Sequence, residues 1–197
     1  MEKYKNVLKF YKDYIKLEQV LRKGWLMCNV PADRIESVAD HTLQLIMLAN
    51  VLTKEFNLQY DEHKLTEMLM IHDLGEVIVG DISEVEDNRE IKKAKEVEAV
   101  KSLFKSLSKE NEEYYYSLWV EMENQNTSLS KFAYLLDKID AVIKAGVYEE
   151  KYNMQGLFDE FYGLQEQRGT FINTQLEEFF EYLGNSYKES KKADFLT

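Results

Sequence analysis

The chain has 197 residues, of which 45% are hydrophobic and 31% charged, so it can bury one sizeable core but is too short for two comfortable domains. Its formal net charge of −11 disfavours binding to DNA or RNA, because affinity for these polyanions comes largely from Lys and Arg. No apolar run reaches the length of a membrane span, the N-terminus lacks a secretory pattern, and the single cysteine excludes an internal disulfide. We therefore expect a cytoplasmic protein with no membrane partner.

Helix-breaking residues are scarce in this sequence, which has eight glycines and one proline. Apolar residues recur at helical spacing over long stretches, which predicts an all-α protein. A first helix is expected over residues 4–23, ending at Gly24. After a loop, a second helix carries His41. A third spans about residues 62–75, where Gly75 is expected to act as its C-terminal stop.

The second half of the chain continues the helical pattern after a turn at Gly80–Asp81. One helix carries Asp137 and runs to about residue 148. The other helices expected there cover about residues 89–106, 114–122, 155–167 and 173–187. The last two are amphipathic and could complete the core or form a dimer contact. We expect one compact helical domain over residues 1–197.

An adjacent histidine and aspartate, His72 and Asp73, stand near the end of the third predicted helix. They place an imidazole nitrogen beside a carboxylate oxygen, which is the ligand mix that zinc, manganese, cobalt or iron accepts. Two ligands alone do not make a site. His41 and Asp137 would complete a set of four in the order His, His-Asp, Asp.

The spacing of apolar residues points these polar side chains into the core. Val38 and Leu45, for example, lie three residues before and four after His41, on the same helical face. A buried imidazole without a partner costs on the order of 1–3 kcal/mol. A single histidine in a core is more often hydrogen-bonded to a backbone carbonyl than bound to a metal. Here, however, polar side chains point inward from three separate helices, and unrelated structural roles would not be expected to produce that pattern. We therefore predict that one divalent cation satisfies all four side chains together.

Short segments around these residues form an ordered series along the chain. They read Arg22-Lys-Gly-Trp25, Asn29-Val30, Glu36-Ser-Val-Ala-Asp-His41, His72-Asp-Leu-Gly-Glu76, Gly80-Asp81-Ile82 and Leu136-Asp137. The series resembles the HD-domain superfamily of metal-dependent phosphohydrolases and, more closely, its 5′-deoxynucleotidase branch. The resemblance covers about residues 22–150.

This resemblance implies an HD-type helical bundle that removes the 5′-phosphate from deoxynucleoside monophosphates. His41, His72, Asp73 and Asp137 would bind one divalent cation, such as Mn, Co, Zn or Fe, that activates the attacking water. Glu76 would take a proton from that water or protonate the leaving 5′-oxygen. If the third helix continues to Glu76, this residue lies at its C-terminal end, on the side of His72 and Asp73.

The resemblance also implies contacts with the substrate. Arg22 matches the phosphate-binding arginine, whose planar donors suit a pair of phosphate oxygens. Asp81 matches the residue that contacts the sugar 3′-hydroxyl and crowds a 2′-hydroxyl. Trp25 could line the nucleoside pocket or pack in the core. Asp40 and Asp140 could orient ligand imidazoles, or they could face solvent or pair with a lysine.

One position departs from the branch, which commonly has a basic residue where Cys28 stands, so substrate affinity could be reduced here.

Two rival interpretations stay open. The first is an HD hydrolase acting on a triphosphate, a cyclic nucleotide or a signalling nucleotide. The second is a catalytically silent HD protein that binds a nucleotide or a partner. For the main interpretation the expected ligand is a small nucleotide, and a homodimer is expected.

Overall fold

The computed structural model describes residues 1–81, 89–168 and 174–190. Within these residues all regular structure is helical, apart from an isolated antiparallel bridge between Leu21 and Ser37. The all-α prediction is confirmed. Ile82 of the Gly80–Ile82 segment and the predicted start of the last helix at Asn173 lie outside the described residues.

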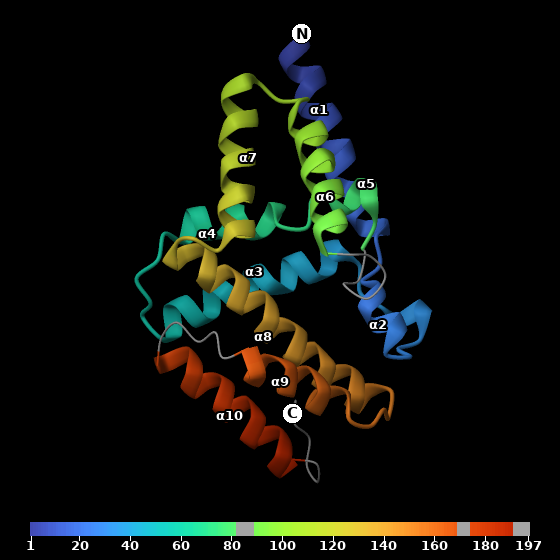
Figure 1. The fold of residues 1–197 in the computed structure, drawn as a ribbon, viewed down its shortest axis with the longest axis vertical. Helices are drawn as coiled ribbons and strands as arrows, with labels where there is room; N and C mark the ends of the chain where they lie inside the picture. Colours follow the sequence, from blue (N-terminus) through green and yellow to red (C-terminus); the bar gives the residue numbers. More distant parts are fainter. Residues whose placement is uncertain (82–88, 169–173, 191–197) are drawn as a thin grey trace.

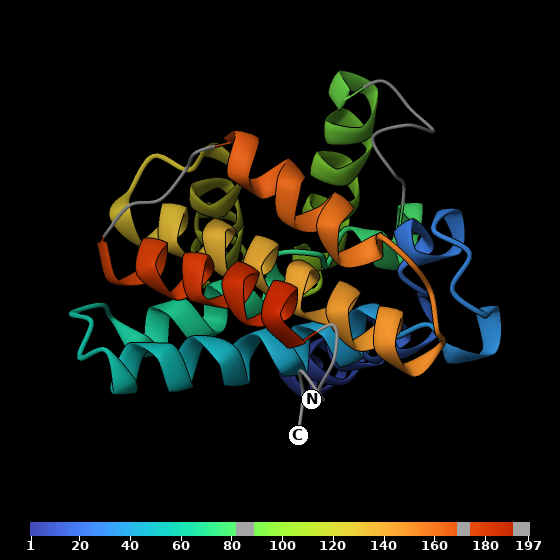
Figure 2. The ribbon, with the colours of Figure 1, turned by 90° about the horizontal axis from the view of Figure 1, so that it is seen from below.

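The helices follow one another through short connections. In chain order they are α1 (Glu2–Tyr14), η1 (Ile15–Gln19), α2 (Lys23–Met27), η2 (Ala32–Arg34), α3 (Val38–Glu55), α4 (Glu62–Ile71), α5 (Glu76–Val79), α6 (Arg89–Phe104), α7 (Lys109–Asn124), α8 (Ser128–Lys151), α9 (Leu157–Arg168) and α10 (Thr174–Ser190), where η marks a 3₁₀ helix. Figure 1 shows α3, α4 and α8 in the middle, with α1, α6 and α7 extending to one side. On the other side α9 and α10 lie along α8 (Figure 2).

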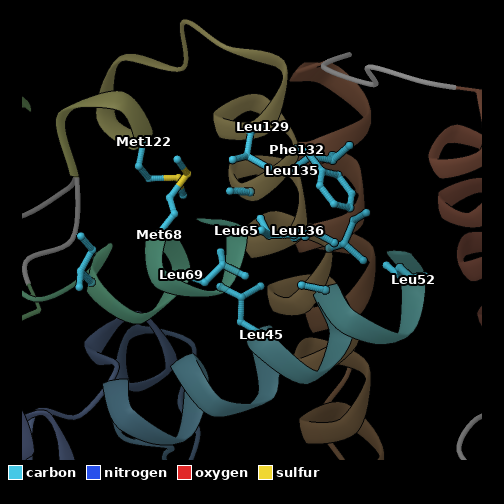
Figure 3. Close-up of a cluster of buried hydrophobic side chains, with 14 of the residues drawn as sticks. Leu45, Leu52, Leu65, Met68, Leu69, Met122, Leu129, Phe132, Leu135 and Leu136 are labelled. Carbon is cyan, nitrogen blue, oxygen red and sulfur yellow. The ribbon is translucent and has the colours of Figure 1, made fainter. Parts of the chain in front are cut away.

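The main apolar core forms where α3, α4, α7 and α8 meet. Its buried side chains point toward one another in Figure 3 and include Leu45, Leu52, Leu65, Met68, Leu69, Met122, Leu129, Phe132, Leu135 and Leu136. Leu176, Phe180 and Leu183 of α10 belong to the same cluster, so the C-terminal helices pack on this core. None of the described helices is long and apolar enough to cross a membrane.

The longest helix, α8, starts at a reciprocal cap. The Thr127 hydroxyl accepts a hydrogen bond from the Ser130 backbone N–H at 3.1 Å, and the Ser130 hydroxyl accepts one from the Thr127 N–H at 3.1 Å. Such a capping box satisfies two backbone donors that the helix itself leaves unpaired. A similar cap, formed by Ser37 and Asp40, begins α3. Both α3 and α8, which carry predicted metal ligands, therefore have fixed starting points.

The predicted first helix over residues 4–23 is wrong in its second half. α1 ends at Tyr14 and, after η1, the chain becomes extended. The backbone N–H of Arg22 then donates to the carbonyl of Glu36 at 3.1 Å. This long-range pairing replaces the helical pattern and brings Arg22 beside the start of α3. Gly24 lies inside α2 instead of ending a helix.

The predicted third helix is also shorter than expected. α4 ends at Ile71, a turn follows, and Glu76 is the first residue of α5 instead of the end of α4. Gly75 keeps a right-handed helical conformation, so it is no left-handed stop. Its role is packing, because an added Cβ would lie 3.3 Å from Val100 Cγ2 on α6. A glycine here lets α6 approach the turn that holds the His-Asp pair.

Candidate metal centre and active site

The four predicted metal ligands lie together. His41 comes from α3, His72 and Asp73 from the turn after α4, and Asp137 from α8. His41 Nε2 is 3.2 Å from Asp137 Oδ1 and 3.9 Å from Asp73 Oδ2. His72 Nε2 is 3.0 Å from Asp73 Oδ2. These four residues are called the histidine–aspartate cluster below.

Each imidazole is oriented through its other ring nitrogen. His41 Nδ1 lies 2.9 Å from Asp140 Oδ2, and His72 Nδ1 lies 2.7 Å from the carbonyl oxygen of Leu69. A carbonyl oxygen can only accept, so Nδ1 of His72 carries the proton in this contact. This arrangement is typical of metal-binding histidines, whose second nitrogen is held by a carboxylate or carbonyl. It directs Nε2 of both rings into the cluster.

The two aspartates predicted as orienting partners have different positions. Asp140 contacts His41, as described above. The carboxylate of Asp40 instead accepts hydrogen bonds from the N–H and the hydroxyl of Ser37, at 3.0 and 2.7 Å. Asp40 thus fixes the start of α3, which places His41 in the first helical turn.

A divalent cation fits the chemistry of this cluster. His41 Nε2 and His72 Nε2 are both buried and, although carboxylate oxygens lie close, neither nitrogen has a hydrogen bond within the described residues. Leaving two buried ring nitrogens in this state costs on the order of 1–3 kcal/mol each. Ligand atoms of His41, His72 and Asp73 lie within 4.8 Å of one another, and Asp137 adds a second carboxylate. Neutral imidazole nitrogens with two carboxylates form a donor set that zinc and related cations accept.

Without a cation, protons compensate the charge of the carboxylates. Burial and the nearby Arg22 oppose protonation of His41, but the adjacent carboxylates of Asp137 and Asp140 outweigh them and raise its pKa to about 9. Burial would raise the pKa of Asp137, but Lys138 and His41 hold it well below the usual range. A bound cation would have to replace the proton on His41, so metal affinity should rise with pH.

Arg22 and Asp81 lie on the side of the cluster next to α2. Arg22 Nη1 is 3.3 Å from Asp73 Oδ2 and is partly buried. The Asp81 carboxylate accepts a hydrogen bond from the Lys23 backbone N–H at 2.5 Å, at the first residue of α2. The structure therefore brings Arg22 into contact with a predicted ligand and places Asp81 against the residue that follows Arg22.

Trp25 packs as a core residue. Only 2% of it is exposed, and its ring stacks on Phe161 and meets Tyr148 edge-on, with centroid distances of 4.8 and 5.1 Å. Its indole N–H donates to Glu36 Oε1 at 3.0 Å. These contacts belong to a second apolar cluster that joins α2, α8 and α9, against which Cys28 also packs. Of the two roles that the sequence left open for Trp25, packing is the one observed.

Glu76 is buried beside the cluster. Burial, and then the nearby carboxylates of Asp73 and Asp81, raise the pKa of Glu76 well above its usual range. Its Oε2 has no hydrogen-bond partner in the described part of the chain. A buried carboxyl group whose pKa is raised and which lacks a partner is suited to transfer a proton to a bound molecule.

A cavity of about 200 Å³ gives access to the cluster. It lies between the His72–Glu76 turn and helices α6, α7 and α8. The residues that line it are His72, Asp73, Gly75, Glu76, Lys92, Lys93, Glu96, Trp119, Met122, Glu123, Gln125, Tyr134, Asp137 and Lys138. Three of the four predicted ligands and Glu76 thus face a space that a small molecule can enter.

Known proteins resemble this chain in sequence and fold. The family model described as HD domain matches residues 15–179. The chain belongs to the HD domain family. The 5′-deoxynucleotidase HDDC2 of Bos taurus is 34% identical over 159 residues, which are 80% of this chain and 75% of that protein. The 5′-deoxynucleotidase hdd1 of Schizosaccharomyces pombe is 28% identical over 74% of each chain.

Solved structures of similar proteins have the same HD fold. A conserved hypothetical protein from Pyrococcus furiosus superposes with a TM-score of 0.73 at 27% identity, covering 89% of this chain and 97% of that one. Together with the names of the relatives, this confirms the resemblance to the HD superfamily and to its 5′-deoxynucleotidase branch.

Sequence reasoning missed some residues of this HD domain's site. Trp119, whose indole N–H donates to the carbonyl of His72 at 3.1 Å, fixes the His-Asp turn from α7. Lys138 contacts Asp137, and Lys92 lines the cavity from α6. For Lys138 a signal existed, because it directly follows a predicted ligand on a strongly apolar helix.

Proposed function

We propose that this protein is a metal-dependent phosphohydrolase that removes the 5′-phosphate from deoxynucleoside 5′-monophosphates. The observation that carries the proposal is the pair of buried Nε2 atoms without hydrogen bonds, which meet two carboxylates next to Arg22 and an open cavity. The names of the relatives support the substrate, since several are 5′-deoxynucleotidases.

We propose one divalent cation per chain, held by His41, His72, Asp73 and Asp137. Mn, Co, Zn and Fe all accept this donor set. Such a cation, when bound, lowers the pKa of coordinated water from about 15.7 toward 7–9, which supplies a nucleophile near neutral pH. The hydrogen bonds to Asp140 and Leu69 keep both imidazoles aimed at it.

The chain's own groups then bind the ester and move protons. Arg22 would donate to phosphate oxygens, for which its planar donor pair is suited. Glu76, whose pKa is raised by burial, would give a proton to the leaving 5′-oxygen or take one from the attacking water. Asp81 would accept a hydrogen bond from the 3′-hydroxyl and leave no room for a 2′-hydroxyl. A direct contact of Trp25 with the nucleoside stays a prediction, while its packing anchors α2 next to Arg22.

We further propose a cytoplasmic homodimer. A dimer is supported by large apolar side chains that the described part of the chain leaves exposed. They lie on α1 at Tyr4, Val7, Leu8 and Tyr11, and on α3 at Leu43, Met47 and Val51. Exposed apolar patches of this kind commonly mark contacts between proteins. Light scattering of the purified protein would give the mass of the assembly, and a monomer at micromolar concentration would contradict the proposed dimer.

A substrate screen tests the proposed activity. Chelator-treated protein would be supplied with Mn²⁺, Co²⁺, Zn²⁺ or Mg²⁺ and incubated with 5′-deoxynucleotides, 5′-ribonucleotides, 3′-nucleotides and nucleoside triphosphates. We expect metal-dependent phosphate release from the 5′-deoxynucleotides, with loose base selectivity. Activity confined to triphosphates would favour another HD hydrolase, and release from none of them would favour a silent nucleotide-binding protein.

A further inference from the structure

Lys138 stands next to the predicted ligand Asp137 on α8 and lines the cavity. Its Nζ donates to Asp137 Oδ2 at 2.7 Å. About a quarter of its side chain, 26%, is exposed. The ammonium group therefore lies at the boundary between the histidine–aspartate cluster and the open space beside it.

The two oxygens of Asp137 have different neighbours. Oδ1 lies 3.2 Å from His41 Nε2, inside the cluster, whereas Oδ2 is bonded to Lys138. The carboxylate can thus turn Oδ1 to a cation without losing the hydrogen bond at Oδ2. Lys138 therefore lies on the side of Asp137 that faces the cavity.

An ammonium group has three N–H donors, and Asp137 occupies one. Asp137 is the one hydrogen-bond acceptor found for Lys138 among residues 1–81, 89–168 and 174–190. The centroid of the Tyr134 ring lies 4.8 Å from Lys138 Nζ. The face of the ring attracts the ammonium group but is not a conventional hydrogen-bond acceptor. Donor capacity therefore remains for a molecule in the cavity.

Two other cations near the cluster also have carboxylate neighbours. Lys92 lies 3.7 Å from Glu96 on the next turn of α6. Arg22 reaches the cluster from the side of α2, where it contacts Asp73 Oδ2 at 3.3 Å. Arg22 and Lys138 thus each contact the carboxylate of a different predicted ligand.

We propose that Lys138 is a second phosphate-binding residue, which donates to a phosphate oxygen of the substrate while Arg22 binds the same group from the other side. This inference rests on the proposed function, because it requires a phosphate ester next to the cluster. The cavity has space for the group, since about 200 Å³ equals several water molecules of about 30 Å³ each. The role differs from simple neutralisation of Asp137, which would need no donor toward the cavity.

The test compares Lys138→Gln with Lys131→Gln, a matched change at an exposed lysine on the same helix. Two binding constants are measured by calorimetry: Mn²⁺ to the chelator-treated protein, and inorganic phosphate to the Mn²⁺-saturated protein. We expect Lys138→Gln to weaken phosphate binding roughly 10- to 100-fold, as for loss of a charge-assisted hydrogen bond, and to raise KM for a 5′-deoxynucleotide similarly. Lys131→Gln should leave both constants unchanged.

A changed Mn²⁺ affinity with unchanged phosphate binding at saturating metal would overturn the proposal, because that is the result of neutralisation alone. If Lys138→Gln does not fold, Lys138→Met, which keeps the length of the side chain, is judged by the same two constants. Lys138→Arg should retain most of the phosphate affinity. If the wild type hydrolyses 5′-deoxynucleotides and Lys138→Gln binds phosphate normally, only this inference fails; if the wild type hydrolyses no phosphate ester, the proposed function fails.

Discussion

Two buried polar networks, each completed by side chains of α8, have opposite requirements. In the network around Glu36, one carboxylate oxygen accepts from the Trp25 indole at 3.0 Å, the other lies 2.8 Å from Lys144 Nζ, and the backbone N–H donates to the Tyr148 hydroxyl at 3.0 Å. Its negative charge thus has a cation within the protein. In the histidine–aspartate cluster two ring nitrogens have no hydrogen bond, and several carboxylates crowd them.

The difference separates a structural group from a binding group. A single buried carboxylate beside a lysine needs nothing from outside, whereas several carboxylates around two imidazole nitrogens need either protons or a cation between them. We therefore expect changes in the Glu36 network to affect stability and changes in the cluster to affect metal binding and activity. Substitutions in the two regions test this contrast, from the largest expected effect to the smallest.

His72→Ala should abolish stoichiometric metal binding and hydrolysis, because it removes a ligand and the group that orients Asp73. Its counterpart is Lys144→Met, which leaves the Glu36 carboxylate buried without a cation. That variant should lose on the order of 3 kcal/mol of unfolding free energy and keep its metal. Calorimetric Mn²⁺ titration and urea unfolding of both variants provide the measurement. If Lys144→Met lost its metal while His72→Ala bound Mn²⁺ normally, the two networks would have the opposite roles to those assigned here.

Glu76→Gln should separate chemistry from metal binding. The side chain keeps its size, so the variant should melt like the wild type and bind Mn²⁺ equally well. Turnover of a 5′-deoxynucleotide should fall roughly 10²- to 10⁴-fold, because the proton carrier is gone. Near-normal kcat would show that the buried carboxyl has no part in the reaction.

Asp81→Ala should reduce the preference for deoxyribose. One crowded contact is worth about 1–3 kcal/mol, so the wild type should favour a deoxynucleotide over its ribonucleotide roughly 5- to 150-fold in kcat/KM. The variant should lose most of that ratio while its kcat on the deoxynucleotide changes less. Matched assays with dAMP and AMP give the ratio, and an unchanged preference would place its origin elsewhere.

Asp140→Asn should weaken metal binding without removing a ligand. Asp140 holds the second nitrogen of His41, and loss of such a partner typically costs about 10- to 100-fold in metal affinity. Asp40→Asn serves as the control, since Asp40 caps α3 and does not contact the ring. Equal metal dissociation constants for the two variants would contradict the assigned role of Asp140.

The pH dependence should differ between the metal-free and the metal-bound protein. The folded-state pKa of His41 is raised from 6.5 to about 9, so the metal-free protein gains stability from this group below pH 6.5 and loses it as pH rises to 9. Metal binding replaces the proton, so the increase in Tm caused by Mn²⁺ should grow over the same interval. Thermal unfolding at a series of pH values measures it, and a constant increase would argue against His41 as a ligand.

Much of the site was predictable because its polar residues break an apolar helical pattern. His41, His72 and Asp137 each occupy core positions, which makes a shared ligand the simplest explanation of the sequence pattern. Lys138 escaped notice because a lysine on a helix is usually solvated, and only the tertiary structure shows that it reaches Asp137 over the cavity.

The errors in the fold have a common physical origin in long-range contacts. The apolar spacing after residue 14 continues a helical pattern, but pairing of the Arg22 backbone with Glu36 extends the chain. Gly75 resembled a helix stop, but its missing side chain accommodates α6. Neither partner lies within the window of sequence that determines a local pattern, so local reasoning could not find them.

The most direct test of the central claim is a crystal structure of the protein grown with Mn²⁺ or Zn²⁺, with an anomalous difference map recorded at the metal edge. We predict one peak per chain within about 2.0–2.3 Å of His41 Nε2, His72 Nε2 and carboxylate oxygens of Asp73 and Asp137. A map with no peak in this cluster at saturating metal, or with the strongest peak held by other residues, would contradict the account.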